Sequence, residues 1–179
     1  MNTWQKFWGH LNTVITHRHN VIVHCKKAGI LGQGLKHDLS KFSPTEFIPG
    51  VKYFQGTRSP NEGERADLGY SLAWMHHKGR NRHHYEYWTD YHAVTKNNGP
   101  VEMPVKYVIE MFCDRVAACK TYLKDKYTDG SALAYYANKK GHRNIHPETQ
   151  KLLETLLTML AEKGEDETFA YIRTLNKDN

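Results

Sequence analysis

Apolar residues recur every three or four positions along most of the chain, and this spacing predicts helices. Residues 3–28 are the first such segment. One apolar stripe on it consists of Trp4, Trp8, Leu11, Ile15 and Ile22. A second stripe combines aliphatic and imidazole side chains, namely His10, Val14, His17, Val21 and His24. The segment "AGILGQG" then ends the helix, because its glycines favour a turn.

The elements that follow are predicted to be short. Residues 35–41 are expected to form a short helix. Ser43, Pro44 and Glu46 then match the N-cap, the first position and the capping-box partner of another helix. In "GTRSPNEGERADLG" a loop is followed by a second Ser-Pro helix start, and this helix is expected to run through Tyr70, Trp74 and His77 until "KGRN" breaks it. A short aromatic segment to about residue 92 and a loop at "KNNGPVEMP" complete this half.

The second half of the chain begins with a long helix, predicted from Pro104 to about Tyr127. Its core stripe consists of Val105, Val108, Phe112, Val116, Cys119 and Leu123. Residues 131–139, 148–163 and 166–176 are predicted to form three further helices. No segment shows the two-residue alternation that is typical of a half-buried strand. The predicted fold class is therefore all-α, with residues 1–179 in a single helical domain.

Composition indicates which kinds of partner and which cellular compartment to expect. The net charge of +6 suits a polyanionic partner, such as a phosphorylated metabolite, a nucleotide or a nucleic acid. The three cysteines, Cys25, Cys113 and Cys119, form no CxxC motif and indicate reduced thiols. The N-terminal residues contain no uninterrupted apolar run and no small-residue cleavage site. We therefore expect a cytoplasmic protein with no signal peptide and no membrane span.

The number of histidines is unusual and indicates a metal site. Ten of the 12 histidines lie between His10 and His92, and histidine is the commonest metal ligand among side chains. The candidate ligands beside apolar stripes are His17, His37, Asp38, His76, His77, His83, His84, Glu110 and Asp114.

Asp114 is the most informative of these candidates. Its helical stripe otherwise contains Tyr107, Met111 and Ala118, so its carboxylate is predicted to be buried. A buried carboxylate requires a cation or several hydrogen-bond donors, because burial otherwise drives it to become neutral. A metal ion would supply that positive charge.

The order of these residues resembles that of the HD-domain superfamily. The matching segments are "THRHNVIVHC" with His17, "LKHDLSKF" with His37 and Asp38, and "EMFCDRVAA" with Asp114. The resemblance covers residues 14–120 and implies a helical metal-binding core, with the C-terminal helices at 131–176 outside it. His19 and His24 are alternatives to His17, which is favoured because the superfamily's first histidine is usually followed four residues later by a small apolar residue.

The whole chain also resembles a small family of uncharacterised bacterial and phage proteins. They share segments of the types "HDLSKFSPTEF" and "HHKGRNRHHYEYW". Some HD-domain enzymes hold a second metal through two extra histidines between the second and third motifs. The resemblance therefore implies one or two divalent ions (Mn, Fe, Co, Mg, Ni or Zn), with His77 and His84 on the second ion and Asp38 as the bridge. His76 and His83 are the alternatives.

The HD-domain resemblance implies a metal-dependent phosphohydrolase acting on a phosphorylated small molecule, with a nucleotide as the expected substrate. Asp38 is the predicted general base, and Lys41 and Arg80 are predicted to hold phosphate oxygens. Two alternatives remain open. One is an HD-type di-iron oxygenase that uses the same six ligands. The other is a non-enzymatic, basic nucleic-acid-binding module with a structural metal.

Overall fold

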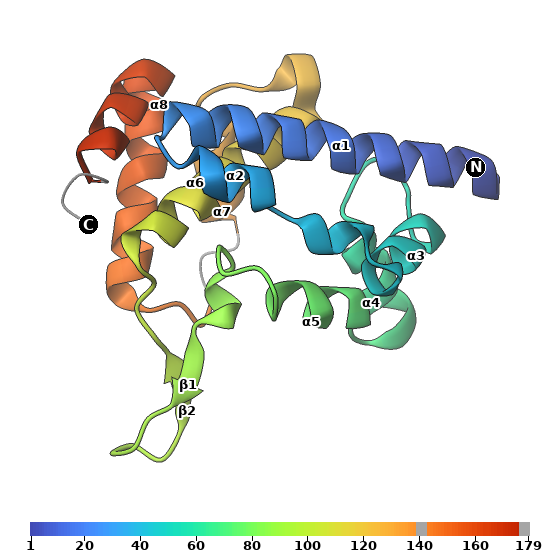
Figure 1. Cartoon of the computed structure of the whole chain (residues 1–179), viewed down its shortest axis with the longest axis horizontal. Coiled ribbons are helices and arrows are strands. Elements are labelled where there is room, and N and C mark those ends of the chain that lie inside the picture. The colour runs from blue at the N-terminus through green and yellow to red at the C-terminus, as the bar shows by residue number, and fades with distance from the viewer. Residues whose placement is uncertain (139–142, 176–179) are drawn as a thin grey trace.

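Helices make up almost all of the regular structure (Figure 1). The computed structural model describes residues 1–138 and 143–175. The helices are α1 (Thr3–Lys27), α2 (Leu31–Lys36), α3 (Pro44–Lys52), α4 (Pro60–Leu68), α5 (Leu72–Lys78), α6 (Val105–Leu123), α7 (Ser131–Ala137) and α8 (Pro147–Leu175). Short 3-10 helices are η1 (Leu39–Phe42), η2 (Tyr85–Tyr87) and η3 (Lys124–Lys126). The all-α prediction is confirmed, and the expected helix ends at residues 139 and 176 lie outside the described residues.

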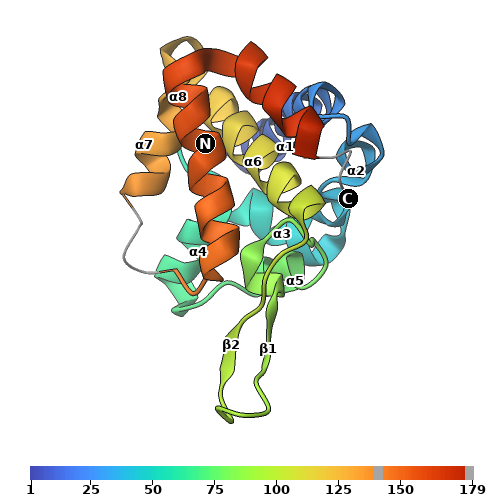
Figure 2. The same ribbon diagram turned by 90° about the vertical axis from the view of Figure 1, so that its left-hand side faces the viewer.

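A small antiparallel hairpin projects from the helical body (Figures 1 and 2). Its strands are β1 (Thr89–Tyr91) and β2 (Asn98–Pro100), with Thr89 opposite Pro100. The sequence predicted an aromatic segment and a loop here. Three-residue strands are too short to show an alternating pattern, and this hairpin has no buried face that would require one.

The hydrophobic core is built around α6, which packs against α1, α7 and α8 (Figure 2). Val108, Phe112 and Val116 of the predicted stripe are fully buried there. Leu123, at the end of the same stripe, is 40% exposed. The stripe prediction therefore holds along the middle of the helix, where neighbouring helices cover it. It fails at the C-terminal end of α6, which extends beyond the core.

The more apolar stripe of α1 faces outward. Trp4 and Trp8 are 71% and 59% exposed, and Ile15 is 52% exposed. The mixed stripe is the inner one, and Val14 and Val21 are buried. This arrangement places the imidazoles of that stripe toward the interior, where polar partners from other helices meet them.

Two predicted helices are interrupted by residues with positive φ. The helix expected at 35–41 is wrong, since α2 ends before His37 and Asp38 has a left-handed conformation with φ 52°. The helix expected through Trp74 and His77 is two helices, α4 and α5, because Gly69 ends α4 with φ 81°. Aspartate and glycine are among the residues that tolerate this conformation.

The C-terminal region follows the prediction of two consecutive helices. Gly164, with φ 79° and ψ 179°, breaks the helical path of α8 between the expected segments 148–163 and 166–176. Within the described part of the chain, no helix combines the length and the apolarity that crossing a membrane requires.

The orientation of α1 can be tested by a matched pair of substitutions. Val21→Ala should lower the free energy of unfolding by about 2 kcal/mol, because it removes fully buried methyl groups. Ile15→Ala should change it by less than about 0.5 kcal/mol, since Ile15 is mostly solvated. Urea denaturation followed by circular dichroism measures both values. A larger loss for Ile15→Ala than for Val21→Ala would contradict the inner face assigned to α1.

Candidate metal centre

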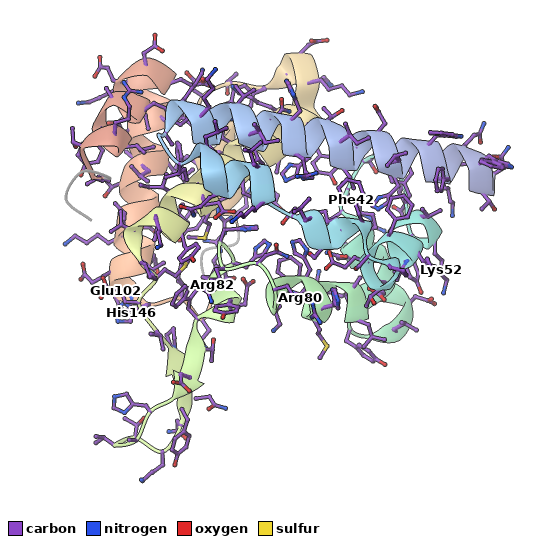
Figure 3. All side chains as sticks on the ribbon, viewed as in Figure 1. Phe42, Lys52, Arg80, Arg82, Glu102 and His146 are labelled. Carbon is purple, nitrogen blue, oxygen red and sulfur yellow. The ribbon has the colours of Figure 1, made fainter. Side chains whose placement is uncertain are left out.

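Side chains from distant parts of the chain meet in the space between α1, α6 and α5. The contributing elements are α1 with His17, the α2–η1 connection with His37 and Asp38, the last turn of α5 with His77, the following loop with His83 and His84, and α6 with Asp114. Side chains fill this space between α1 and α5 in Figure 3. All six residues predicted as metal ligands are therefore brought together.

The first set of ligand atoms surrounds one oxygen of Asp114. His17 Nε2 lies 3.0 Å from Asp114 Oδ1, and His37 Nε2 lies 3.6 Å from the same oxygen. Asp38 Oδ2 is 3.5 Å from His37 Nε2 and 4.0 Å from His17 Nε2. This set matches the predicted first site, and His17 is the histidine of α1 that takes part in it.

The two alternatives to His17 lie elsewhere. His19 is exposed. His24 is buried but contacts other groups: its Nδ1 lies 2.5 Å from the Asn20 backbone oxygen, and its Nε2 lies 3.1 Å from Lys120 Nζ. Neither imidazole reaches the carboxylates of the first set.

The second set surrounds the other oxygen of Asp38. His77 Nε2 lies 3.2 Å and His83 Nε2 lies 3.4 Å from Asp38 Oδ1. A ligand atom of His84 belongs to the same group, whose members all lie within 4.8 Å of one another. The predicted pair of His77 and His84 is thus joined by His83, whereas His76 is directed to Glu46 instead.

Asp38 connects the two sets because each of its oxygens faces a different one. Burial by itself raises the pKa of this carboxyl, but His37, His77 and Lys41 hold it well below its ordinary value. Imidazole nitrogens lie 3.5 Å from one oxygen and 3.2 Å from the other, so the geometry suits a bridging ligand better than the predicted general base.

A carboxylate behind the first ligands orients two of the imidazoles. Glu110 Oε1 lies 3.0 Å from His37 Nδ1 and 3.2 Å from His83 Nδ1. Burial alone raises the Glu110 pKa, but the bonds from these two histidines lower it to about 2. An ionised carboxylate only accepts, so each imidazole donates through Nδ1. Such second-layer contacts are typical of metal-binding histidines.

Glu46 plays the same orienting role for the second set. Its Oε2 accepts from His77 Nδ1 at 2.7 Å, and its Oε1 accepts from His76 Nδ1 at 2.6 Å. The prediction that Glu46 completes a capping box is wrong, and Ser43 makes no side-chain cap bond. A glutamate three residues after an N-cap has the same sequence pattern whether it completes a capping box or bonds a distant histidine. Only the packing of α5 beside α3 shows which partner it has.

The loop that carries His83 and His84 is fixed by Asn81. Its side-chain amide donates to the His77 backbone oxygen at 2.8 Å and to Ser40 Oγ at 2.9 Å. The Trp88 indole then donates to the Arg82 backbone oxygen at 2.7 Å. These bonds explain why the break at "KGRN" folds the second histidine pair back beside the first.

Several buried nitrogen and oxygen atoms of the centre have no hydrogen-bond partner. Because Nδ1 of His37, His77 and His83 is bonded to carboxylates, the Nε2 atoms turned toward Asp38 are lone pairs in the neutral imidazole. Four buried atoms here have no hydrogen-bond partner, namely His37 Nε2, Asp38 Oδ1, His83 Nε2 and His84 Nε2. A cation at the first set would satisfy His37 Nε2, and one at the second set would satisfy the other three atoms, so the residues fit divalent metal.

The charges lead to the same conclusion. Burial and the neighbouring histidines hold the pKa of His84 well below its ordinary value, which keeps that imidazole neutral. Burial raises the pKa of Asp114, but His17 and His37 overcome this and hold it well below its ordinary value. Burial lowers the pKa of His37, but Asp38, Asp114 and Glu110 raise it to about 10, so without a metal a proton on this imidazole supplies the positive charge. A metal ion would displace that proton, because imidazole binds metal in its neutral form.

The two predicted phosphate-binding residues differ in position. Lys41 Nζ lies 3.4 Å from Asp38 Oδ2, and its side chain is 27% exposed. Arg80 is an exposed residue beside α5, and its guanidinium donates to the backbone oxygen of His76 (Figure 3). Among the described residues, no ion pair joins Arg80 to a carboxylate of the centre. The structure brings Lys41 to the centre and leaves Arg80 outside it.

Residues 6–159 match the sequence profile of DUF5662, a family of unknown function. The chain belongs to this family. Every ligand atom of the candidate centre lies within the DUF5662 region. No curated protein and no solved structure matches the chain. The resemblance to HD domains therefore stays a prediction that rests on the motifs and on this geometry.

The choice of His17 over its neighbour is open to a direct test. His17→Ala should lower the metal content of the protein purified without chelator by about half, because one set loses a nitrogen ligand. The matched variant His19→Ala should keep the wild-type content. Elemental analysis by mass spectrometry measures both. Equal metal content in the two variants would remove His17 from the centre.

The role of the carboxylate behind the ligands can be tested separately. Glu110→Gln should weaken metal binding by about 10- to 100-fold, since a neutral amide no longer fixes His37 and His83 as donors. Glu102→Gln changes an exposed glutamate and should leave affinity unchanged (Figure 3). Competition with a chelating dye gives the dissociation constants. Unchanged affinity in Glu110→Gln, with its fold intact by circular dichroism, would reject the orienting role.

Proposed function

We propose that this protein is a metal-dependent phosphohydrolase that acts on a phosphorylated small molecule, with a nucleotide as the favoured substrate. The observation that carries the proposal is the position of Asp38. Its two oxygens face separate nitrogen sets, while the amine of Lys41 lies 3.4 Å from one of them. Ligands for metal and a cation for phosphate thus stand side by side.

His17, His37, Asp38 and Asp114 would hold one ion, and Asp38 with His77, His83 and His84 would hold a second. A divalent ion at such a site lowers the pKa of bound water and polarises a phosphoryl oxygen. The protein's own contribution is to orient the imidazoles through Glu110 and Glu46.

Access to the centre favours the first set as the place where substrate enters. The side chains of His17 and Asp114 are 12% and 19% exposed, whereas those of His77 and His83 are each 2% exposed. Lys41 is on the accessible side and stays charged, because Asp38 and Asp114 raise its pKa against the effect of burial. Its amine can therefore neutralise an oxygen of a phosphate at the first set.

A phosphorylated substrate also agrees with the charge of the chain. The net charge of +6 attracts anions over a range set by screening. The same positive charge would also favour binding to nucleic acid. It therefore supports an anionic ligand in general and not one particular molecule.

A second candidate is an HD-type di-iron oxygenase. The observation that favours it is the nitrogen-rich second set, in which three histidines accompany the shared aspartate. Imidazole combined with carboxylate accommodates iron as well as the redox-silent divalent metals. Metal identity and oxygen consumption distinguish this candidate from the hydrolase.

The phosphohydrolase proposal is tested with a panel of nucleotides and sugar phosphates, in the presence of Mn²⁺, Mg²⁺, Co²⁺ or Fe²⁺. Wild-type protein should release phosphate from at least one substrate, and EDTA should abolish the release. Asp114→Asn should reduce kcat by about 100-fold or more, because it removes a charged ligand. Lys41→Met should mainly raise KM, by about tenfold, since it removes one charge-assisted contact.

His19→Ala serves as the control, with rates expected to equal those of the wild type. Release of phosphate that is insensitive to EDTA, or equal in Asp114→Asn, would reject this function. Oxygen uptake with bound iron and without phosphate release would favour the oxygenase.

A further inference from the structure

The outer face of α1 carries a row of apolar side chains that are open to solvent. Trp4, Trp8 and Ile15 are mostly exposed, and Leu11 between them is partly exposed. α1 packs against α2, α3 and α6, and its N-terminal half lies at the edge of the molecule (Figure 1). We call these four residues the outer stripe. An exposed apolar surface of this kind is typical of an interaction site.

The spacing of the outer stripe is that of a seam between two helices. Its residues follow one another at intervals of four, three and four positions, which is how the two apolar positions of a heptad repeat alternate. The next position of the pattern is Arg18, whose guanidinium is bonded to the backbone oxygens of His37 and Leu35. The seam therefore ends after Ile15, and it spans about three turns of helix.

The two tryptophan rings are held in place by their neighbours. Phe7 packs edge-on against both of them, with its ring centre 6.1 Å from that of Trp4 and 5.3 Å from that of Trp8. Phe7 in turn packs against Phe47 of α3 at 5.5 Å. Side chains that are already ordered lose less conformational freedom on association. Tryptophan is also one of the residue types that contribute most to binding at protein interfaces.

The outer stripe is complementary in size to a second copy of itself. In an antiparallel pair with the two-fold axis between positions 8 and 11, Trp8 lies opposite Leu11 of the second copy. The same axis places Trp4 opposite Ile15. Each large ring then meets a smaller aliphatic side chain, as interdigitated packing requires. A parallel pair would instead set each tryptophan against its own equivalent.

The charges beside the outer stripe allow such a pair. Gln5 and Asn12, the polar residues at the flanking heptad positions, are uncharged. The amine of Lys6 donates to the Lys52 backbone oxygen of α3, on the side of the helix away from the stripe. Helices that lie on membranes carry lysines and arginines beside their apolar face. The neutral flanks therefore favour a second protein copy over a lipid surface.

We propose that the outer stripe is the contact surface of a weak homodimer, in which two copies of α1 pack antiparallel. A tryptophan side chain buries about 150–250 Å², so the exposed parts of four rings would contribute on the order of 600 Å². The aliphatic and flanking side chains bring the interface to about 1,000 Å², which is at the lower end for specific complexes. The dissociation constant should therefore be on the order of 10–100 μM.

A dimer of this affinity is mostly dissociated at the low micromolar concentrations that spectroscopic denaturation uses. The small effect expected for Ile15→Ala on the free energy of unfolding therefore refers to the monomer. Association has to be measured separately, at higher protein concentration.

Sedimentation velocity of the full chain, from about 5 to 500 μM, tests the proposal. The average mass should rise with concentration from the 20.8 kDa of one chain toward twice that value. Trp8→Glu should weaken association by about tenfold or more, because it places a carboxylate in an apolar contact. The matched control Val94→Glu changes an exposed apolar residue between β1 and β2 and should associate as the wild type does. Circular dichroism checks that each variant is folded.

A mixture of two variants tests the antiparallel arrangement. Trp4→Glu and Ile15→Lys should each associate more weakly than the wild type when alone. Mixed in equal amounts, they should associate about tenfold more tightly than either does alone. In the antiparallel pair, one carboxylate lies opposite one amine, and the other tryptophan–isoleucine contact is intact. No gain on mixing would overturn the antiparallel arrangement.

A wild type that stays monomeric at every concentration, or equal association of Trp8→Glu and the wild type, overturns the proposal. Vesicles of equal parts phosphatidylserine and phosphatidylcholine test the competing occupant. Binding of these vesicles by a monomeric wild type, lost in Trp8→Glu, would assign the outer stripe to a lipid surface instead. These measurements need neither metal nor turnover, so their outcome is independent of whether the protein is a hydrolase.

Discussion

The contact on which the centre depends is the one between Asp38 and the imidazoles on its two sides. A buried carboxylate surrounded by nitrogen lone pairs is unstable unless a cation or added protons supply positive charge. The left-handed backbone at Asp38, with φ 52°, turns its side chain into this position between α2 and η1. Strained conformations of this kind persist when the surrounding structure fixes them, and they concentrate at functional sites.

The surrounding helices explain how that position is maintained. α6 supplies both Asp114, which faces the first set, and Glu110, one turn earlier, which holds two imidazoles by their Nδ1 atoms. The opposite faces of α6 pack into the hydrophobic core through Phe112 and Val116. One rigid helix therefore links the packing of the domain to the geometry of the centre. This arrangement is what a preorganised site requires.

Polar atoms without hydrogen-bond partners gather around Asp38, namely His37 Nε2, Asp38 Oδ1, His83 Nε2 and His84 Nε2. Protein interiors rarely leave such groups unsatisfied, and this clustering is the reason for proposing a cation there. In the proposed hydrolase, the same ion would serve the substrate, because a divalent ion is the usual companion of phosphate oxygens in enzymes.

Helical periodicity and the His-Asp and Asp-Arg motifs are local signals, so the sequence alone predicted the helical class, the core stripe of α6 and most of the residues that meet at the candidate centre. Sequence did not distinguish His83 from His76, or the inner face of α1 from its more apolar outer face. It also assigned Glu46 to a capping box, although Glu46 bonds His76 and His77. Those outcomes depend on which helices pack against one another. The carboxylates that bond the buried imidazoles are brought to them by the packing of α3, α5 and α6. Tertiary structure decided them because electrostatic pairing in the interior acts between residues that are far apart in the chain.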